Sequence, residues 1–234
     1  MMAFTKTTKT MLSIVVAWAM MAGFANADLV ITEVLSDSAH SGGVANGDWW
    51  ELTNTGSSSV DLTGYYWDDD GPTGNDGALF GDIIIAAGES IVIVSEDDDD
   101  LFEQAWGGGF NAYGETNFTG PDTFSGLSSN GDQIQLWDAD PNAGAPFNLV
   151  ASVSFGPATE GFSFQWSATG AFLGLSEFGV NGAFTAIDDG SDDNTRPNDG
   201  IDVGSPGIAT AIPEPGAATI AVIGFALAAV RRRR

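Results

Sequence analysis

Between two apolar terminal runs, the chain consists of short segments in which apolar and polar residues alternate. The clearest of these segments are residues 29–35, 48–54, 133–137 and 149–155. Alternation with a period of two places successive side chains on opposite faces of a β-strand. Turns rich in Gly, Asn, Asp and Ser separate the segments. The pattern predicts an all-β fold, built as an antiparallel β-sandwich.

Further segments complete this prediction. Additional strands are expected at residues 60–67, 80–85, 90–95 and 162–166. One short helix is expected at 101–106, because the aspartates before it can accept the free N–H groups of a helix start and three glycines follow it. Residues 167–210 are rich in Gly, Asp, Asn and Pro and are expected to form a long irregular segment at the end of the domain.

The C-terminal segment, 211–234, has three ordered parts. Pro213, Glu214 and Pro215 are followed by an uncharged apolar run at 216–230, and then by Arg231, Arg232, Arg233 and Arg234. The run has about 15 residues where a comfortable span needs roughly 20, but the arginines favour a membrane-stopped helix with its basic end in the cytoplasm. The three parts together resemble the PEP-CTERM sorting signal. That resemblance implies processing by an exosortase near Pro-Glu-Pro, followed by release to the cell surface or an extracellular polysaccharide matrix.

The N-terminal segment, 1–27, has the features of a secretory signal peptide. Lys6 and Lys9 precede an apolar run at 11–21, and Ala25 and Ala27 have the spacing that signal peptidase accepts. The predicted organisation is therefore a signal peptide at 1–27, a β-sandwich domain at 28–210 and a sorting signal at 211–234. The protein is expected to be exported across the inner membrane and anchored by its C-terminal helix before processing.

The body between these ends is strongly acidic. Of 32 acidic residues only Glu214 lies in the tail, and of seven basic residues only Arg196 lies outside the terminal segments. Such a body is repelled by phosphate backbones and anionic headgroups, which argues against nucleic acid and membrane-surface partners. The chain has no cysteine, so a packed core and not a disulfide framework must stabilise it.

The order of the predicted strands carries a second resemblance. Its segments are 29–34, 50–54, 60–65, 87–90, 127–132 and 204–207. Together they resemble the lamin-tail domain family, which implies an immunoglobulin-like β-sandwich. The Gly/Ser-rich loop before Trp49, the aspartate clusters and the glycines after Trp106 depart from the family pattern.

Metal and catalytic chemistry have little support in the sequence. The best calcium candidate is an acidic segment that offers Asp188, Asp189, Asp192, Asp193, Asn194 and Asp199. Its alternative is a disordered acidic loop. Another set of oxygen ligands, Asp138, Asp140 and Asn142, departs from the calcium-loop pattern at its sixth and twelfth positions, and a hairpin turn explains it better. A nucleophile triad lacks material, because the only histidine, His40, lies in a Ser/Gly-rich stretch.

The expected function is therefore non-enzymatic. A surface or matrix protein acting in adhesion, structure or interaction is the first prediction. The first alternative is a calcium-dependent glycan-binding module, since sugar rings stack on exposed aromatic faces. The rings considered for this role are Trp49, Trp50, Tyr65, Tyr66, Trp67, Trp106, Trp137 and Trp166. A secreted hydrolase that uses two carboxylates is the second alternative.

Overall fold

A computed structural model describes residues 29–39, 47–72, 77–95, 99–120, 124, 126–186 and 202–209. The predicted signal peptide, the acidic segment at 188–199 and the predicted sorting signal lie outside these residues. Within them, no helix has the length and apolar character needed to cross a membrane.

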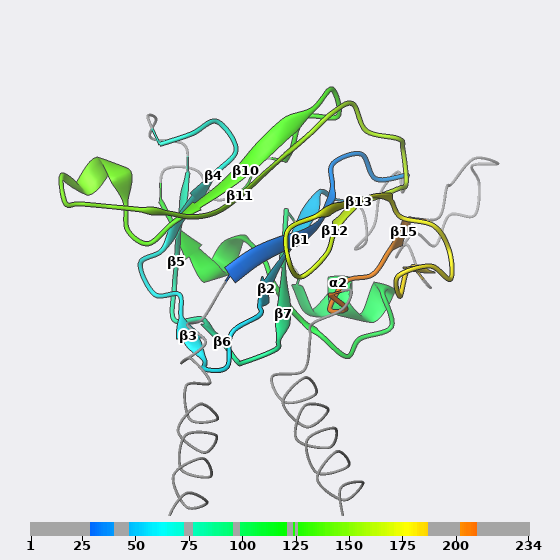
Figure 1. The fold of residues 1–234 in the computed structure, drawn as a ribbon, viewed down its shortest axis with the longest axis horizontal. Helices are drawn as coiled ribbons and strands as arrows, with labels where there is room; N and C mark the ends of the chain where they lie inside the picture. The colour runs from blue at the N-terminus through cyan, green and yellow to red at the C-terminus, as the bar shows by residue number, and fades with distance from the viewer. Residues whose placement is uncertain are drawn as a thin grey trace, which may run out of the picture.

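The described chain is mostly β, with one short α-helix, α2 (Asp99–Ala105) (Figure 1). The strands are β1 (Leu29–Leu35), β2 (Trp49–Asn54), β3 (Val60–Asp61), β4 (Tyr66–Asp68), β5 (Ala78–Phe80), β6 (Ile84–Ile85), β7 (Ser90–Val94), β8 (Asn111–Tyr113), β9 (Phe118–Thr119), β10 (Asp132–Trp137), β11 (Leu149–Phe155), β12 (Phe164–Trp166), β13 (Phe172–Leu175), β14 (Phe184–Thr185) and β15 (Val203–Gly204). Two 3-10 turns lie at Glu115–Asn117 and Pro141–Ala143.

Two sheets form the body of the domain. The larger is six-stranded, in the order β13-β12-β1-β2-β7-β8, and the smaller is five-stranded, in the order β11-β10-β4-β5-β9. Two further ribbons pair β14 with β15 and β3 with β6. The prediction of an all-β fold is confirmed, and so are the strands at 29–35 and 149–155 at their predicted bounds.

Some details differ from the predictions. The strand expected at 60–67 is divided into β3 and β4, because Gly64 adopts a positive φ of 81° and turns the chain between them. The segment expected to be irregular after Ser167 contains β13, which extends the larger sheet, as well as β14 and β15. Not every pair is antiparallel either, since β8 runs parallel to β7.

The core between the two sheets is built from the apolar faces that alternation predicts. Trp50 lies in this core and packs on Trp67 at a ring-centroid distance of 5.2 Å and on Phe80 at 6.4 Å. Ile134 and Leu136 of β10 contribute from the smaller sheet. Removing a buried aromatic side chain of this kind costs about 3–5 kcal/mol of stability, so this core contributes much of the stability of the domain.

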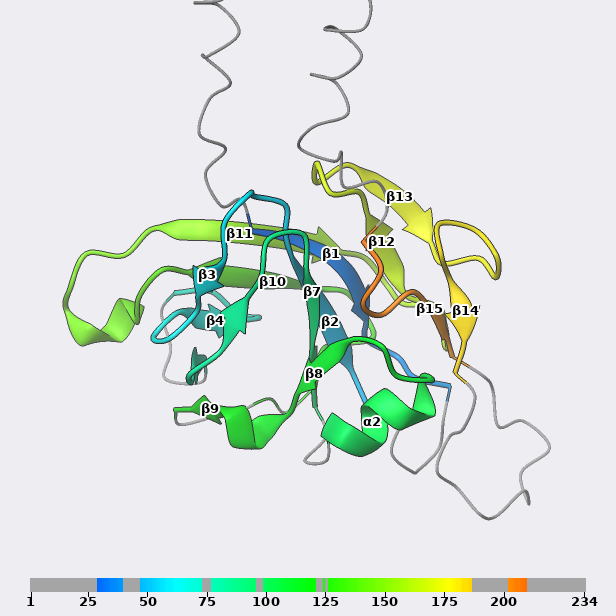
Figure 2. The same cartoon turned by 90° about the horizontal axis from the view of Figure 1, so that it is seen from below.

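A second core lies on the opposite face of the larger sheet. Trp49 and Val92 point to this side, where Phe102 and Trp106 of the α2 region cover them. Figure 2 shows α2 on one side of the strands β1, β2 and β7, and the β10–β11 hairpin on the other. Trp49 and Trp50 thus lie on opposite faces, as their alternation predicts, but α2 buries the outer one as fully as the inner one.

The helix itself follows from its sequence. Asp99 and Asp100 occupy its first turn, and Phe102 and Ala105 form its buried face. The helix ends where Gly107 and Gly108 adopt positive φ values of 87° and 69°. The prediction of one short helix before the glycines is confirmed, although the helix begins at Asp99, two residues earlier than predicted, and so includes Asp99 and Asp100.

Candidate functional site

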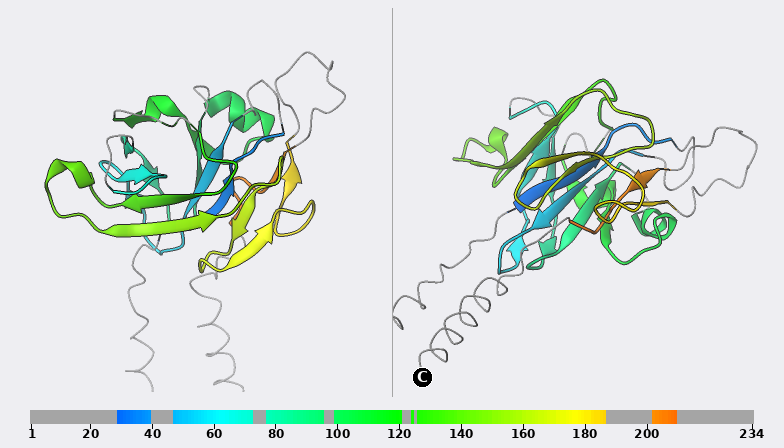
Figure 3. Two further views of the ribbon diagram at one scale, coloured as in Figure 1. Left: turned by 90° about the horizontal axis from the view of Figure 1, so that it is seen from above. Right: turned by 45° about the vertical axis from the view of Figure 1, so that its right-hand side comes forward.

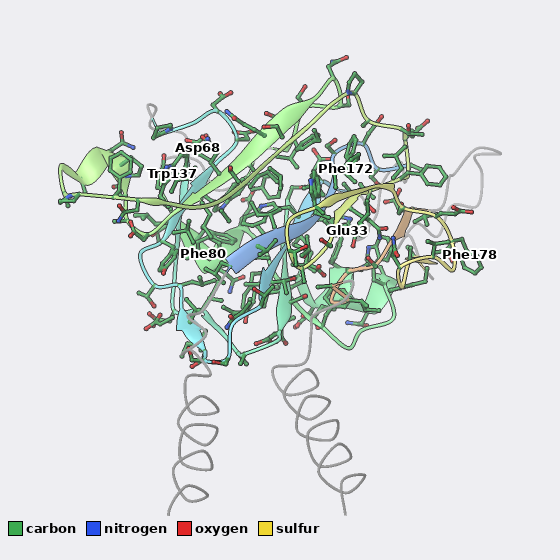
Figure 4. All side chains as sticks on the ribbon, in the orientation of Figure 1. Glu33, Asp68, Phe80, Trp137, Phe172 and Phe178 are labelled. Carbon is green, nitrogen blue, oxygen red and sulfur yellow. The ribbon has the colours of Figure 1, made fainter. Side chains whose placement is uncertain are left out.

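Two glutamates face each other on the outer side of the larger sheet. Glu33 of β1 pairs directly with Glu51 of β2, and a register shift between Ile31 and Glu33 marks a β-bulge. The bulge lets Thr32 and Glu33 both turn their side chains to the outer face, because the extra residue breaks strict alternation. Figure 4 shows Glu33 in the interior of the molecule, near the orange strand β15 at the end of the described chain.

Glu33 is almost fully surrounded by hydrogen-bond donors. Its carboxyl oxygens accept from the Ser163 hydroxyl at 2.5 Å, from the Ser205 hydroxyl at 2.5 Å and from the Ser205 backbone N–H at 2.9 Å. The Gln165 amide adds a longer contact at 3.4 Å. With four donors from β12, β15 and their neighbours, Glu33 ties the strand pair β1–β12 to the segment around Ser205.

Glu51 holds the next residues of the same segment. It accepts from the Gly207 backbone N–H at 2.7 Å and lies 2.5 Å from the Thr32 hydroxyl. Thr32 then contacts Thr53 at 2.7 Å, and Thr53 contacts Ser90 at 2.7 Å. The result is a continuous row of hydroxyl groups across β1, β2 and β7 that begins at the Glu51 carboxyl group.

Burial shifts the acidity of both glutamates. Glu33 is 1 % exposed and Glu51 is 0 % exposed. Desolvation raises the pKa of Glu33, although its hydrogen bonds oppose the change. Desolvation, followed by repulsion from Glu33, raises the pKa of Glu51 to about 8. No Lys, Arg or His lies among the described residues to compensate this charge, so at neutral pH the pair holds a proton.

Other acidic side chains fasten neighbouring loops. Asp202, fully buried, accepts from the Ser38 hydroxyl and from the Ala39 backbone N–H, both at 2.7 Å. Asp48 accepts the Leu127 N–H at 2.5 Å, and desolvation raises the pKa of Asp48 to about 6. Each carboxyl group joins segments that lie far apart in the sequence.

The segment held in this way, residues 202–209, packs too closely for larger residues. A Cβ added to Gly207, whose φ is 79°, would lie 2.3 Å from the Cβ of Phe110. One added to Gly204 would lie 2.9 Å from the Trp49 ring and 3.1 Å from a carboxyl oxygen of Glu33. We call residues 202–209 the closing segment, because they seal both the acid pair and the second core.

A shallow cavity opens at the far end of the hydroxyl row. It has a volume of about 350 Å³, and Ser90, Gly207, Glu89, Phe110 and Asn111 are among its lining residues. The Glu89 carboxyl group accepts from the Asn111 amide at 2.6 Å. The cavity is therefore polar, but its charged group is already engaged, and the two buried glutamates lie behind the closing segment.

The arrangement is suited to holding structure and not to catalysis. A general acid or nucleophile must touch its substrate, whereas Glu33 and Glu51 are sealed from solvent and their oxygens hold the closing segment. Neither glutamate was among the site residues predicted from the sequence. A signal was present, because a glutamate inside each of two apolar strand segments is a charge at a position where burial is expected.

The predicted calcium ligands receive no structural description, since Asp188, Asp189, Asp192, Asp193, Asn194 and Asp199 lie outside the described residues. Within those residues, no group of three or more His, Cys, Asp or Glu side chains is arranged to hold a metal ion. In the β10–β11 loop, Asp138 accepts from Asn148 and Asp140 accepts from the Asn142 backbone N–H. The interpretation of this loop as a hairpin turn thus agrees with its hydrogen bonds.

The aromatic rings considered for sugar stacking lie mainly in the cores. Seven of them are buried: Trp49, Trp50, Tyr66, Trp67, Trp106, Trp137 and Trp166. Only Tyr65 of the set is partly exposed. Stacking on the faces of the seven buried rings is closed to a sugar, so a glycan would have to use other residues.

Comparison with known proteins identifies the family. The sequence model of the Lamin Tail Domain matches residues 23–156, which is more than half of the chain. No curated protein and no solved structure gives a significant match. The matched region holds both buried glutamates, while Ser205 and Gly207, to which they bind, lie beyond it. The all-β body agrees with this match, and the chain belongs to the lamin tail domain family.

Proposed function

We propose that this chain is an exported protein of the cell surface or extracellular matrix, processed by an exosortase, whose domain acts in adhesion, structure or interaction. Catalysis is not part of the proposal. The observation behind this exclusion of catalysis is the use of the buried carboxyl groups: Glu33 and Glu51, whose pKa values are raised by burial, fasten the closing segment and have no access to solvent. A domain of the lamin-tail type is typically non-enzymatic, which supports the same conclusion.

The surface of the domain supports an interaction role. Large apolar side chains are exposed along β13 and the turn that follows it: Phe172 is 59 % exposed and Phe178 is 69 % exposed. Figure 4 shows Phe178 at the periphery of the molecule, in contrast to the interior position of Glu33. Large exposed apolar side chains of this kind can take part in contacts with a partner.

The proposed route to the surface rests on the terminal segments of the sequence. Export is assigned to the segment before Asp28, and retention before processing to the apolar run after Pro215. The alternatives are a calcium-dependent glycan-binding module, whose predicted ligands at 188–199 lie outside the described residues, and a secreted hydrolase that uses two carboxylates.

The test is mass spectrometry of the mature protein in its native cell, combined with fractionation. We expect the matrix or surface fraction to contain chains that begin at Asp28 and end near Pro213. A variant with Pro213, Glu214 and Pro215 all changed to Ala should stay in the membrane fraction at full C-terminal length. An intact chain in the cytoplasm, or an unprocessed chain in the matrix, would refute the proposal.

A further inference from the structure

The side-chain amide of Gln165, in β12, touches both a hydroxyl group and a buried carboxyl group. Its Nε2 atom donates to the Ser205 hydroxyl at 2.9 Å and lies 3.4 Å from Oε1 of Glu33. The Ser205 hydroxyl donates to the other oxygen of Glu33, Oε2, at 2.5 Å. Ser205 follows β15 directly, and Figure 3 shows β15, in orange, beside the yellow strand β14 with which it pairs. The three side chains therefore form a closed triangle between β1, β12 and the closing segment.

This triangle is sealed from water. Glu33 is 1 % exposed, Ser205 is 2 % exposed and Gln165 is 3 % exposed. The printed neighbours of Glu33 all donate to it, so its ionised form is the one they stabilise, and the proton shared by the acid pair belongs on Glu51. The seal excludes a substrate from outside, but it does not exclude a reaction between groups of the chain itself.

We propose that Ser205 and Gln165 join in an intramolecular ester cross-link, and that the Glu33 carboxylate transfers the proton in this reaction. The inference goes beyond the proposed function, which assigns no chemistry to the domain. The reaction happens once within each chain and has no turnover, so the domain is the reactant and not an enzyme.

The reaction balances without an oxidant or a co-reactant. The Oγ atom of Ser205 attacks Cδ, the side-chain carbonyl carbon of Gln165, while Glu33 takes the hydroxyl proton. A C–O bond forms and the C–N bond of the amide breaks. Glu33 returns the proton to the departing nitrogen, which leaves as ammonia, and the carboxylate is restored. A hydroxyl group and a primary amide thus become an ester and ammonia, and the ammonia is lost to the solution.

The geometry supplies what this reaction requires. A hydroxyl group is a weak nucleophile until a base at hydrogen-bond distance takes its proton, and Glu33 lies at that distance. Because an amide C–N bond is about 1.33 Å long, the 2.9 Å contact places Oγ of Ser205 within about 4.2 Å of the carbon that it attacks. Holding the two groups in contact replaces a high concentration of reactant. Desolvation raises the pKa of Glu33, which makes its carboxylate a stronger base.

The cross-link gives this chain a covalent fastening that it cannot obtain from disulfides, because it has no cysteine. Gln165 and Ser205 are 40 residues apart, so the bond closes a long loop that contains β13, β14 and β15. Covalent closure of a long loop stabilises a fold mainly by restricting the unfolded chain. The exclusion of water that favours the reaction also protects the ester from hydrolysis.

Peptide mapping of the full-length protein, purified in its folded state, tests the cross-link directly. A protease that cuts after Asp and Glu releases Gln165 in the peptide 161–177 and Ser205 in the peptide that begins at Val203. We expect these two peptides as one joined species, with the sum of their masses less one ammonia molecule. Hydroxylamine should separate them and leave a hydroxamate at position 165. Two separate peptides of unaltered mass, from protein kept folded for days, would overturn the inference.

Variants assign the roles. Ser205→Ala removes the nucleophile and Glu33→Gln removes the base, so each should abolish the joined peptide. Ser38→Ala is the matched control, because it removes another hydroxyl group that binds the closing segment, through Asp202, and leaves the triangle untouched; it should keep the joined peptide. Tryptophan fluorescence checks that each variant is folded. A joined peptide that survives Ser205→Ala contradicts the inference. Either negative result leaves the proposed function standing, because export and processing are measured separately.

Discussion

The sharpest consequence of the buried acid pair concerns stability against pH. The pKa of Glu51 is raised from an ordinary value of 4.5 to about 8 in the folded chain. Between these two values the folded state keeps a proton that the unfolded state has lost, so each rise in pH favours unfolding. The stability penalty is absent below about pH 4.5, grows through neutral pH and is complete near pH 8.

The magnitude follows from the size of this shift. One pKa unit corresponds to about 1.4 kcal/mol, so the penalty at pH 8 is on the order of 5 kcal/mol. A typical domain has a total stability of about 5–15 kcal/mol, so the buried pair of Glu51 and Glu33, whose pKa is also raised, should dominate the pH dependence. Asp48, with a pKa near 6, adds to the same trend at lower pH.

Glu51→Gln removes the titration and keeps the shape of the side chain. Its amide oxygen can accept from the Gly207 N–H, and its NH₂ group can donate to the Thr32 hydroxyl. We expect the variant to match the natural chain within about 1 kcal/mol at pH 5 and to exceed its stability by several kcal/mol at pH 8. Urea unfolding of residues 28–212, followed by tryptophan fluorescence at several pH values, measures this difference.

Glu33→Gln is the matched control, because it makes the same chemical change one strand away. Both oxygens of Glu33 accept hydrogen bonds from Ser205, so an amide NH₂ in place of one oxygen would meet a donor. We expect a loss of about 1–3 kcal/mol at pH 8. The reasoning is refuted if Glu51→Gln and the natural chain show parallel stability curves from pH 5 to pH 8.

Three further outcomes are expected from the same structure. Gly207→Ala should destabilise the domain by more than about 2 kcal/mol, because its Cβ would collide with Phe110. Gly170→Ala has a similar positive φ but open space around it, so it should cost only about 1–2 kcal/mol. Thermal melts of both variants measure the difference. Asp202→Asn should cost about 1–3 kcal/mol in urea unfolding, since it sets an amide against two donors, and a neutral result would show that this carboxyl group does not hold the closing segment. Asp138→Ala should cost about 1 kcal/mol or less, because its hydrogen bonds lie in an exposed turn, and calorimetry with calcium should give the same heat before and after the change.

Local patterns in the sequence were sufficient for the parts of the fold that local physics decides. Alternation gave the bounds of β1 and β11, and acidic capping followed by glycine gave α2. The division of 60–67 into two strands was not predicted, because strand-favouring residues such as Val60 and Tyr66 lie on both sides of the turn at Gly64. The strand β13 was missed for a related reason, since Gly174 inside it is itself a turn signal.

The acid pair depends on contacts that a local pattern cannot contain. Glu33 and Ser205 are separated by 172 residues, and the β-bulge that turns Thr32 outward has no distinct composition. The same limit applies to Trp49, which alternation places outside the sandwich and which only the packing of α2 shows to be buried. In each case the missing information is which distant element covers the outer face of the sheet.

The closing segment also has a consequence for the order in which this protein can fold. The first strand of the domain, β1, lies between β2 and β12, and the donors to its Glu33 among the described residues lie at positions 163, 165 and 205. In a growing chain, Glu33 therefore lacks these donors and β1 lacks its neighbour β12 until nearly all of the domain has been synthesised. Because such distant contacts form slowly, the domain can complete its core only after the closing segment has been synthesised.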